Sequence, residues 1–223
     1  MSRSAAALVL VLVAASCSRP PSLLNGLDPV VANAIQGCDR LEPVRRDWCA
    51  VQFVGADLAT GPAVYELCRR LRDPLARDRC LEVSARNIAE PAPATVCLSI
   101  VDPRIRQGCW VSAAAGLGVS DPQGAMAICQ QVPAVLLACA QGVVAARAPS
   151  WTQDDEAQVG EDVGQIVGTS ASLAGSPDLG RVVGSATRQS RMVVSSDVLC
   201  AAFDPGNARL ACLRAHLDAG VDG

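Results

Sequence analysis

Residues 67–83 read LCRRLRDPLARDRCLEV, and in this stretch Cys68 and Cys80 flank the pair Asp73-Pro74 at nearly equal distances. Proline is favoured at the first position of a helix, where its missing N–H is not needed, and aspartate is a good N-cap before it. The residue before a proline is pushed out of the α region, which ends the preceding helix. The stretch therefore predicts two helices joined by a tight turn at Asp73-Pro74.

The two cysteines lie where a disulfide would join these helices. Each stands about one and a half turns from the bend, which is roughly 9 Å along a helix that rises ~1.5 Å per residue. Packed helices lie ~8–10 Å apart, and cysteines on their facing sides can close to the ~5.5 Å Cα separation of a disulfide. We therefore expect an αα-hairpin stapled by a disulfide between Cys68 and Cys80.

The same unit recurs along the chain. Four other stretches also place one proline between two cysteines: CDRLEPVRRDWC, CLSIVDPRIRQGC, CQQVPAVLLAC and CAAFDPGNARLAC, with Pro43, Pro103, Pro133 and Pro205. The second cysteines of the first four units, Cys49, Cys80, Cys109 and Cys139, are spaced 31, 29 and 30 residues apart. A fixed period in this range is typical of a repeat array.

The recurrence predicts five disulfides between neighbouring cysteines: Cys38–Cys49, Cys68–Cys80, Cys97–Cys109, Cys129–Cys139 and Cys200–Cys212. Starts of the first helices are predicted at Asp28-Pro29, Gly61-Pro62, Pro91–Pro93 and Asp121-Pro122. We expect four stapled hairpins within residues 28–149 and a last one within residues 197–223.

Residues 150–196 contain no cysteine. Apolar residues at helical spacing on both sides of a break at Gly175-Ser176-Pro177 predict a fifth hairpin without a staple, with Ala171 and Val183 where the cysteines would stand. A loose insert is the alternative, because five glycines lower the helix propensity here: Gly160, Gly164, Gly168, Gly180 and Gly184.

The composition favours helices over sheets. Half of the residues are apolar but only 3% are aromatic, so the core must consist of Ala, Val and Leu, and small side chains let helices approach closely. The predicted fold is all-α, an array of about six antiparallel αα-hairpins, five of them stapled. The net charge of −3 is too small to predict a nucleic-acid partner or contact with a membrane surface. The 19 basic residues are all Arg, which excludes mechanisms that need a catalytic Lys.

The first residues, MSRSAAALVLVLVAASCS, combine Arg3, an apolar run and small residues before Cys17. This segment resembles a bacterial lipoprotein signal peptide with its lipobox, although Ala14 stands where the family usually has Leu. The resemblance implies removal of residues 1–16, a palmitate-type lipid on Cys17, a tether over residues 17–27, and outer-membrane sorting through Ser18, on the periplasmic side or the surface. An ordinary secretory signal cut after Ser16 is the alternative.

Counting cysteines supports the lipid interpretation. The chain has 11 cysteines, an odd number for an exported protein, and lipidation of Cys17 leaves ten for disulfides in an oxidising compartment. The mature chain resembles the Sel1-like cysteine-rich repeat proteins of bacterial envelopes in architecture only, so the resemblance implies no functional residues.

The sequence predicts no catalytic residue, no metal site and no cofactor. The cysteine pairs lack the C-x2-4-C spacing of zinc sites and the C-x-x-C of thiol redox enzymes. His216, the single histidine, is interpreted as a partner of a helix C-terminus rather than a general base. A group of carboxylates is expected to form a solvated helix start instead of an acid–base pair: Asp154, Asp155, Glu156, Glu161 and Asp162.

Arginines gather at the predicted tips of the first hairpins. The candidate partner-binding edge comprises Arg69, Arg70, Arg72, Arg77, Arg79, Arg104 and Arg106. Such an edge could bind an anionic partner, such as lipid phosphate, cell-wall polymer or an acidic protein. The alternative is that these arginines only complement helix ends.

Helical repeat arrays present extended surfaces that suit binding. The sequence thus favours a non-enzymatic, lipid-anchored scaffold or binding protein of the cell envelope, attached to the membrane and in contact with an envelope partner. The alternatives are an accessory subunit or enzyme whose site forms only in a complex, and a protein that binds a small ligand on a concave face.

Overall fold

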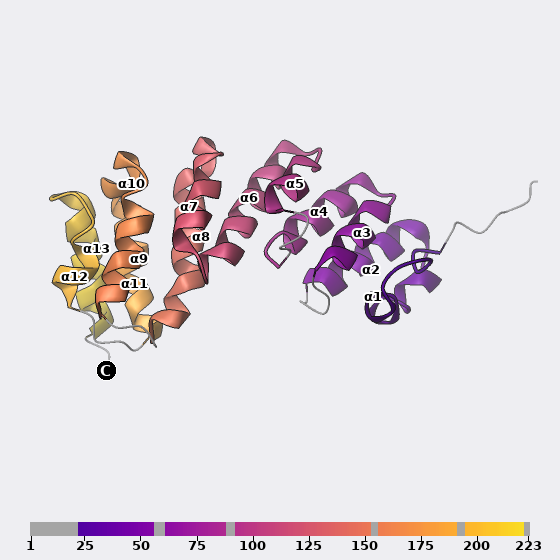
Figure 1. Ribbon diagram of the computed structural model, residues 1–223, viewed down its shortest axis with the longest axis horizontal. Helices are drawn as coiled ribbons and strands as arrows, with labels where there is room; N and C mark the ends of the chain where they lie inside the picture. Colours follow the sequence, from indigo (N-terminus) through magenta and orange to yellow (C-terminus); the bar gives the residue numbers. More distant parts are fainter. Residues whose placement is uncertain (1–21, 56–60, 88–91, 153–155, 191–194, 221–223) are drawn as a thin grey trace, which may run out of the picture.

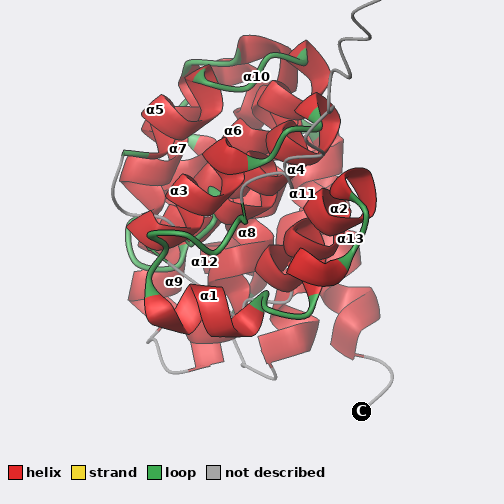
Figure 2. Cartoon of the chain, turned by 90° about the vertical axis from the view of Figure 1, so that its right-hand side faces the viewer, coloured by secondary structure: helices red, strands yellow, loops and turns green. Residues whose placement is uncertain are grey.

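A computed structural model describes residues 22–55, 61–87, 92–152, 156–190 and 195–220. These residues form α-helices and short 3-10 helices joined by turns, without a strand among them (Figures 1 and 2). The helices pair into antiparallel hairpins that stand side by side in a curved row from α1 at one end to α13 at the other (Figure 1). The predicted all-α array of stapled hairpins is confirmed.

Each hairpin has a first and a second main helix. The first helices are α1 (Pro29–Ala34), α3 (Pro62–Arg70), α5 (Pro93–Leu98), α7 (Pro122–Gln130), α9 (Glu156–Val167) and α12 (Ser196–Cys200). The second helices are α2 (Pro43–Gly55), α4 (Pro74–Ser84), α6 (Pro103–Gly118), α8 (Leu136–Arg147), α11 (Pro177–Ser190) and α13 (Asn207–Gly220). Short helices complete the array: η1 (Cys38–Arg40), η2 (Pro133–Val135), η3 (Ala148–Thr152) and α10 (Ala171–Ala174).

Prolines and aspartates begin the helices much as predicted. The carboxylates of Asp73 and Asp102 accept backbone N–H groups in the first turns of α4 and α6. Two helix starts differ from the prediction. Pro133 begins the 3-10 helix η2 instead of α8, and α13 begins two residues after Pro205, because Gly206 turns the chain with φ of 136°.

All five predicted disulfides are present, each between neighbouring cysteines. Their Cα–Cα separations run from 5.3 to 5.8 Å, the usual range for an unforced disulfide. In the first hairpin, Cys38 lies in η1 rather than in an α-helix, because α1 ends after six residues.

The core follows the row of hairpins. One cluster of buried side chains runs from Leu23 to Ala113, and a second from Ala114 to Cys212, so both include part of α6. Ile128 in α7 packs against both clusters. The largest fully buried side chain among the described residues, Trp151, belongs to the second cluster. As the composition predicts, most other core residues are Val, Leu, Ala and Cys.

The hairpin without cysteines is packed like its neighbours. Val159, Val163 and Ile166 of α9 are buried, as is Val183 of α11. Ala171 is exposed at the start of α10, so the prediction that it replaces a cysteine is wrong. Helix α9 ends at Val167, and the extra short helix α10 follows before the turn. Residues on this side of the turn are therefore displaced from the positions that the first cysteines occupy in the stapled hairpins.

Two of the glycines in this region explain how it packs. A Cβ atom on Gly180 would lie 2.5 Å from the carbonyl oxygen of Ala208, and one on Gly184 would lie 2.3 Å from that of Cys212. These glycines, one turn apart, therefore let the backbones of α11 and α13 approach closely. The loss of helix propensity that argued for a loose insert is offset by this contact.

The residues just before the first hairpin pack on it. Leu23 and Leu27, which were expected in a tether, are buried in the first core cluster. Ser22 Oγ donates a hydrogen bond to Asp39 Oδ2 at 2.7 Å, and the Leu23 N–H donates to Asp39 Oδ1 at 3.1 Å. The predicted signal peptide and Cys17 lie outside the described residues, as do Asp154 and Asp155.

Within the described residues, one helical segment, Pro133–Trp151, is long and apolar enough to cross a membrane by length and composition alone. It comprises η2, α8 and η3, and its central helix packs between α6, α7, α9 and α11. A core helix of a stacked array satisfies the same criterion.

Candidate functional site at the hairpin tips

The turns that carry the staples lie along the same edge of the row, the upper rim in Figure 1. We call these turns the hairpin tips. Most of the residues singled out from the sequence lie at the tips of the first three hairpins. The contacts there show which side chains hold the fold together and which remain available to a partner.

Asp47, in α2, joins the first hairpin to the second. It is fully buried, and its Oδ2 accepts the backbone N–H groups of Arg72 and Asp73 at 2.7 and 2.9 Å. Its Oδ1 lies 3.4 Å from the guanidinium of the buried Arg46. A buried carboxylate is tolerated because charged hydrogen bonds of this kind compensate for its lost hydration.

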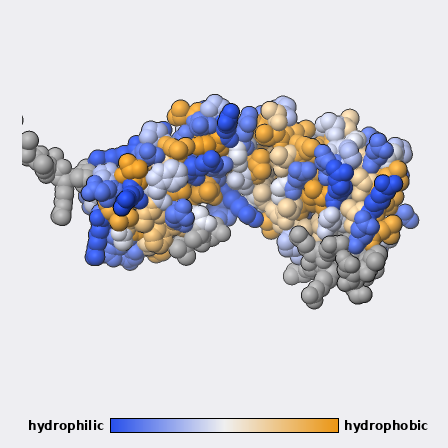
Figure 3. All heavy atoms as spheres, turned by 180° about the vertical axis from the view of Figure 1, so that it is seen from behind, coloured by the Kyte–Doolittle hydropathy of each residue, from blue (hydrophilic) through white to orange (hydrophobic). Residues whose placement is uncertain are grey.

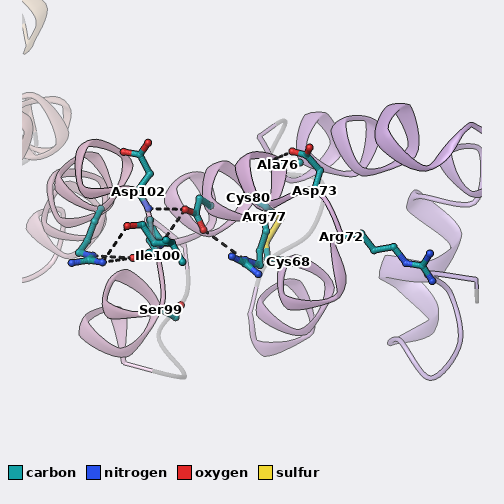
Figure 4. A network of polar contacts seen from close by, with 12 residues as sticks. Cys68, Arg72, Asp73, Ala76, Arg77, Cys80, Ser99, Ile100 and Asp102 are labelled. Carbon is teal, nitrogen blue, oxygen red and sulfur yellow. Dashed lines mark hydrogen bonds and ion pairs between the residues drawn. A yellow bond between two sulfur atoms is a disulfide. The ribbon is translucent and has the colours of Figure 1, made fainter.

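Asp78, in α4, repeats this contact one hairpin further along. Its Oδ2 accepts the backbone N–H groups of Val101 and Asp102 at 3.1 and 2.9 Å (Figure 4). Its Oδ1 has no hydrogen bond among the described residues and lies 3.6 Å from Arg77 Nε. The two inter-hairpin aspartates, Asp47 and Asp78, thus fix the tips of three successive hairpins relative to one another.

Sequence reasoning missed the inter-hairpin aspartates, although a signal was present. Asp47 and Asp78 each lie two residues before the second cysteine of their hairpin, in the matching stretches RDWC and RDRC. The third hairpin has Gln107 at this position and the fourth has Leu137. The contact is therefore a feature of the first three hairpins and not of the whole array.

Two arginines of the candidate edge bond to backbone carbonyls. Arg106 donates to the carbonyl oxygen of Ile100 from Nε at 2.9 Å and from Nη2 at 2.6 Å (Figure 4). Arg70 donates to the carbonyl oxygens of Asn25 and Gly26, which holds the N-terminal segment against the second hairpin. Carbonyl oxygens carry no net charge, so these hydrogen bonds leave the positive charges of both arginines uncompensated.

Three more arginines of the candidate edge pair with carboxylates. Arg69 lies 3.3 Å from Glu66 and stacks over Tyr65, and Arg79 lies 2.6 Å from Glu82. Arg77 contacts Asp78, as described above. These pairs neutralise much of the charge that the sequence suggested for this edge.

The last two arginines of the candidate edge are exposed. Neither Arg72 nor Arg104 has a side-chain hydrogen bond or ion pair within the described part of the chain, and Arg72 extends away from the polar network in Figure 4. Arg40 and Arg45 at the first tip are also exposed, and neither has a side-chain hydrogen bond or ion pair among the described residues. The structure thus brings four available guanidinium groups to the first three tips.

Exposed apolar side chains accompany these arginines. Five large ones lie at the same tips with exposed fractions between 44% and 68%: Leu41, Val44, Leu75, Leu98 and Val101. We call these five residues and the four arginines the tip edge. Hydrophobic and hydrophilic residues are interspersed over the N-terminal half of the surface in Figure 3. Such a mixture can take up both an apolar and an anionic group.

Two of the carboxylates that were expected at a solvated helix start, Asp162 and Glu156, differ from each other in their surroundings. Asp162 is buried, and that expectation is wrong for this residue. Its Oδ2 accepts from Arg147 Nε at 2.7 Å and from Trp151 Nε1 at 3.1 Å, while Oδ1 accepts from Gln158. Asp162 therefore joins α8, η3 and α9.

Glu156 does lie at the exposed start of α9, and it contacts the residue that precedes α12. Its Oε1 accepts the backbone N–H of Ser195 at 2.7 Å. Hydrogen bonds from the Ser195 side chain and backbone lower the pKa of Glu156, because they favour its charged form.

The remaining sites predicted or considered from sequence can be placed briefly. His216 lies half-buried in the second half of α13. No group of three or more metal-ligating side chains occurs within the described ranges. Two shallow hollows, each of about 500 Å³, lie between α11 and α13 and between α7 and α9. Gln, Gly and Thr residues line much of the second hollow.

Comparison of the chain with family models, with curated proteins and with solved structures found no significant match.

Proposed function

We propose that the protein is a lipid-anchored, non-enzymatic scaffold or binding protein of the bacterial cell envelope. The observation that carries this proposal is the stack of five disulfide-stapled hairpins. Disulfides of this number persist in oxidising compartments, and cytosolic proteins rarely keep them. The lipobox-like segment that ends at Cys17 adds the anchor.

The arrangement of the hairpins supports a binding role. Stacked repeats present long surfaces, and the staples and inter-hairpin aspartates hold the tips at fixed positions. A surface that is ordered before binding loses little entropy when a partner docks. The partner would be an envelope protein or an anionic component of the membrane or cell wall, contacted through the exposed tips.

The anchor is tested by expressing the full-length chain and its Cys17→Ser variant in a Gram-negative host. We expect the wild-type chain in the membrane fraction, with residues 1–16 removed and acyl chains on Cys17 by mass spectrometry. The variant should lack the acyl chains. A wild-type chain that stays in the cytoplasm with free thiols would contradict the proposal.

The binding role is tested by cross-linking in cells, followed by solubilisation of the membrane and identification of the linked proteins. A reproducible envelope partner is the expected result. Catalytic turnover by the purified lipidated chain would contradict a purely non-enzymatic role.

A further inference from the structure

We propose that the tip edge lies on the surface of an anionic phospholipid bilayer, in the leaflet that holds the lipid on Cys17. This inference rests on the proposed function for the anchor, and it adds the orientation of the array on the membrane. The hairpin tips would face the lipid, and the opposite ends of the helices would face away from it.

The composition of the tip edge matches a bilayer interface. Interfacial protein segments combine exposed apolar side chains with Arg or Lys, so that the apolar groups enter the acyl boundary while the cations contact phosphates. Leu75 and Val101 project from the second and third tips, next to Arg72 and Arg104. An acidic protein partner would need the cations but would not require this series of exposed apolar residues.

The charges at these tips favour an anionic surface. The carboxylates of Asp73 and Asp102 accept backbone N–H groups as helix caps, and that of Asp39 accepts from Ser22 and Leu23, so all three keep their negative charge. Among the described residues, Arg70 and Arg106 bond to carbonyl oxygens and to no carboxylate, so their charges add to those of the four exposed arginines of the tip edge. Glu42 at the first tip is exposed. Outside the four ion pairs, six arginines of the first three tips therefore stand against four carboxylates, a net charge of +2: Arg40, Arg45, Arg70, Arg72, Arg104 and Arg106 against Asp39, Glu42, Asp73 and Asp102.

The path of the chain gives an independent argument. Ser22 is bonded to Asp39 at the first tip, so the described chain begins at this edge of the molecule. Cys17 is five residues earlier, and five residues span at most roughly 17 Å. A lipid on Cys17 would hold the first tip close to the bilayer, which raises the effective concentration of phospholipid at the tip edge.

The tips of the later hairpins differ in composition. The fourth tip carries Gln130, Gln131 and Ala134. The sixth carries Asp204 and Asn207, with one arginine, Arg209, bonded to backbone carbonyls, and one exposed large apolar side chain, Leu210. The mixture of arginines and large apolar side chains is thus densest at the three tips nearest the predicted anchor and recurs at the sixth with one residue of each kind. This distribution fits a membrane contact that begins at the anchor and extends along half of the array.

The experiment uses the complete chain from residue 17 to residue 223 with the substitution Cys17→Ser, so that it carries no lipid. It is mixed with vesicles of 30% phosphatidylglycerol in phosphatidylcholine. The tip variant combines Arg72→Ala and Arg104→Ala, and a second variant combines Leu75→Ser and Val101→Ser. Arg86→Ala with Val119→Ser is the matched control, because both residues are exposed at the opposite ends of α4 and α6. Disulfide mapping and circular dichroism establish that each variant is folded.

We expect co-sedimentation with the anionic vesicles and little with pure phosphatidylcholine. Each arginine near an anionic surface contributes about fivefold in affinity, so the double Arg variant should bind on the order of 25-fold more weakly. The Leu75/Val101 variant should also bind more weakly, and the control variant should bind as the parent does. Reduced binding at high salt is expected for the same reason.

Three results would overturn the inference. The first is no preference of the parent chain for anionic vesicles, and the second is an equal loss in the control variant. The third is tight binding to soluble polyglutamate with no effect of Leu75→Ser and Val101→Ser on vesicle binding, which would make an acidic macromolecule the partner. The vesicle assay uses a chain without lipid, so a negative result in it does not contradict the acylation of Cys17. In the same way, absence of acylation in the anchor test does not change what the vesicle assay measures.

Discussion

At the scale of single residues, the inter-hairpin aspartates are the polar groups on which the N-terminal half of the array depends. Each one is buried and accepts two backbone N–H groups from the turn of the next hairpin. Removal of such an acceptor leaves several polar groups without partners in a place that water does not reach. These positions should therefore tolerate substitution less well than the exposed ion pairs nearby.

The substitution Asp47→Ala should lower the free energy of unfolding of the first two hairpins by about 3 kcal/mol, because two N–H groups and Arg46 lose their acceptor. Hydrogen exchange at the Arg72 and Asp73 amides measures the loss directly. Asp47→Asn keeps an acceptor oxygen and should restore part of the protection. As a control, Glu66→Ala breaks only an exposed pair and should change the stability by less than about 1 kcal/mol. Equal effects of Asp47→Ala and Glu66→Ala would contradict this account.

Glu156 gives a pH-dependent contact. Its pKa is lowered in the folded protein by hydrogen bonds from Ser195, so the contact is fully present above the ordinary pKa of a glutamate. In the folded protein, Glu156 becomes protonated only as the pH falls through its lowered pKa. The contact should therefore weaken at a pH below the ordinary pKa of a glutamate. The Ser195 amide shift in an NMR titration follows this change, and Glu156→Gln should abolish it. A Ser195 titration that persists in the variant would assign the change to another group.

The sequence predicted the contacts of some of these aspartates and not those of others. Asp73 and Asp102 were predictable as N-caps because a cap and its N–H partner lie within three residues of each other. Asp47 bonds to backbone atoms 25 and 26 residues away, and Asp162 to a tryptophan 11 residues away. Such partners are set by the packing of hairpins, which local pattern does not determine.

At the scale of elements, the close approach of α11 and α13 depends on two glycines, Gly180 and Gly184. The spacing of prolines and cysteines predicted most helix starts, because caps and turns are local. The insertion of α10 was not predictable in this way, because the break after Val167 carries no proline and the hairpin has no cysteine to mark its register.

Substitution of Gly184 by Ala should destabilise the last two hairpins by about 1–3 kcal/mol, because the new Cβ would overlap the carbonyl oxygen of Cys212. Gly164→Ala is the matched control. Gly164 also lies within a helix of the same hairpin, but a Cβ there meets no atom within 4 Å, so this change should stabilise by up to about 1 kcal/mol. Urea denaturation compares the two variants, and the opposite order of stabilities would contradict the packing of α11 against α13.

At the scale of the whole molecule, each hairpin contacts mainly its neighbours in the row. The stability of such an array is a sum of local terms, and damage to one unit spreads only to the adjacent ones. The core clusters show the same organisation, since they divide within α6 and not between separate domains.

Removal of one staple should therefore have a confined effect. Replacement of Cys68 and Cys80 by Ala should cost about 3 kcal/mol, the chain-entropy value for a loop of this length. Hydrogen exchange followed by mass spectrometry should show faster exchange in α3, α4 and the adjacent α2 and α6, with α11 and α13 unchanged. Faster exchange throughout the described helices would show instead that the array unfolds as one cooperative unit.

The sequential order of the staples has a consequence for biosynthesis. Every disulfide joins cysteines that are adjacent in the chain and separated by 10 to 12 residues. In the proposed export with the N-terminus first, and with Cys17 acylated, each pair of thiols from Cys38 onward becomes available before the next pair emerges. A simple thiol oxidase that joins consecutive cysteines then makes the native bonds. Non-native bonds require the oxidase to skip a cysteine. Maturation of this chain should therefore need an oxidase but little help from a disulfide isomerase.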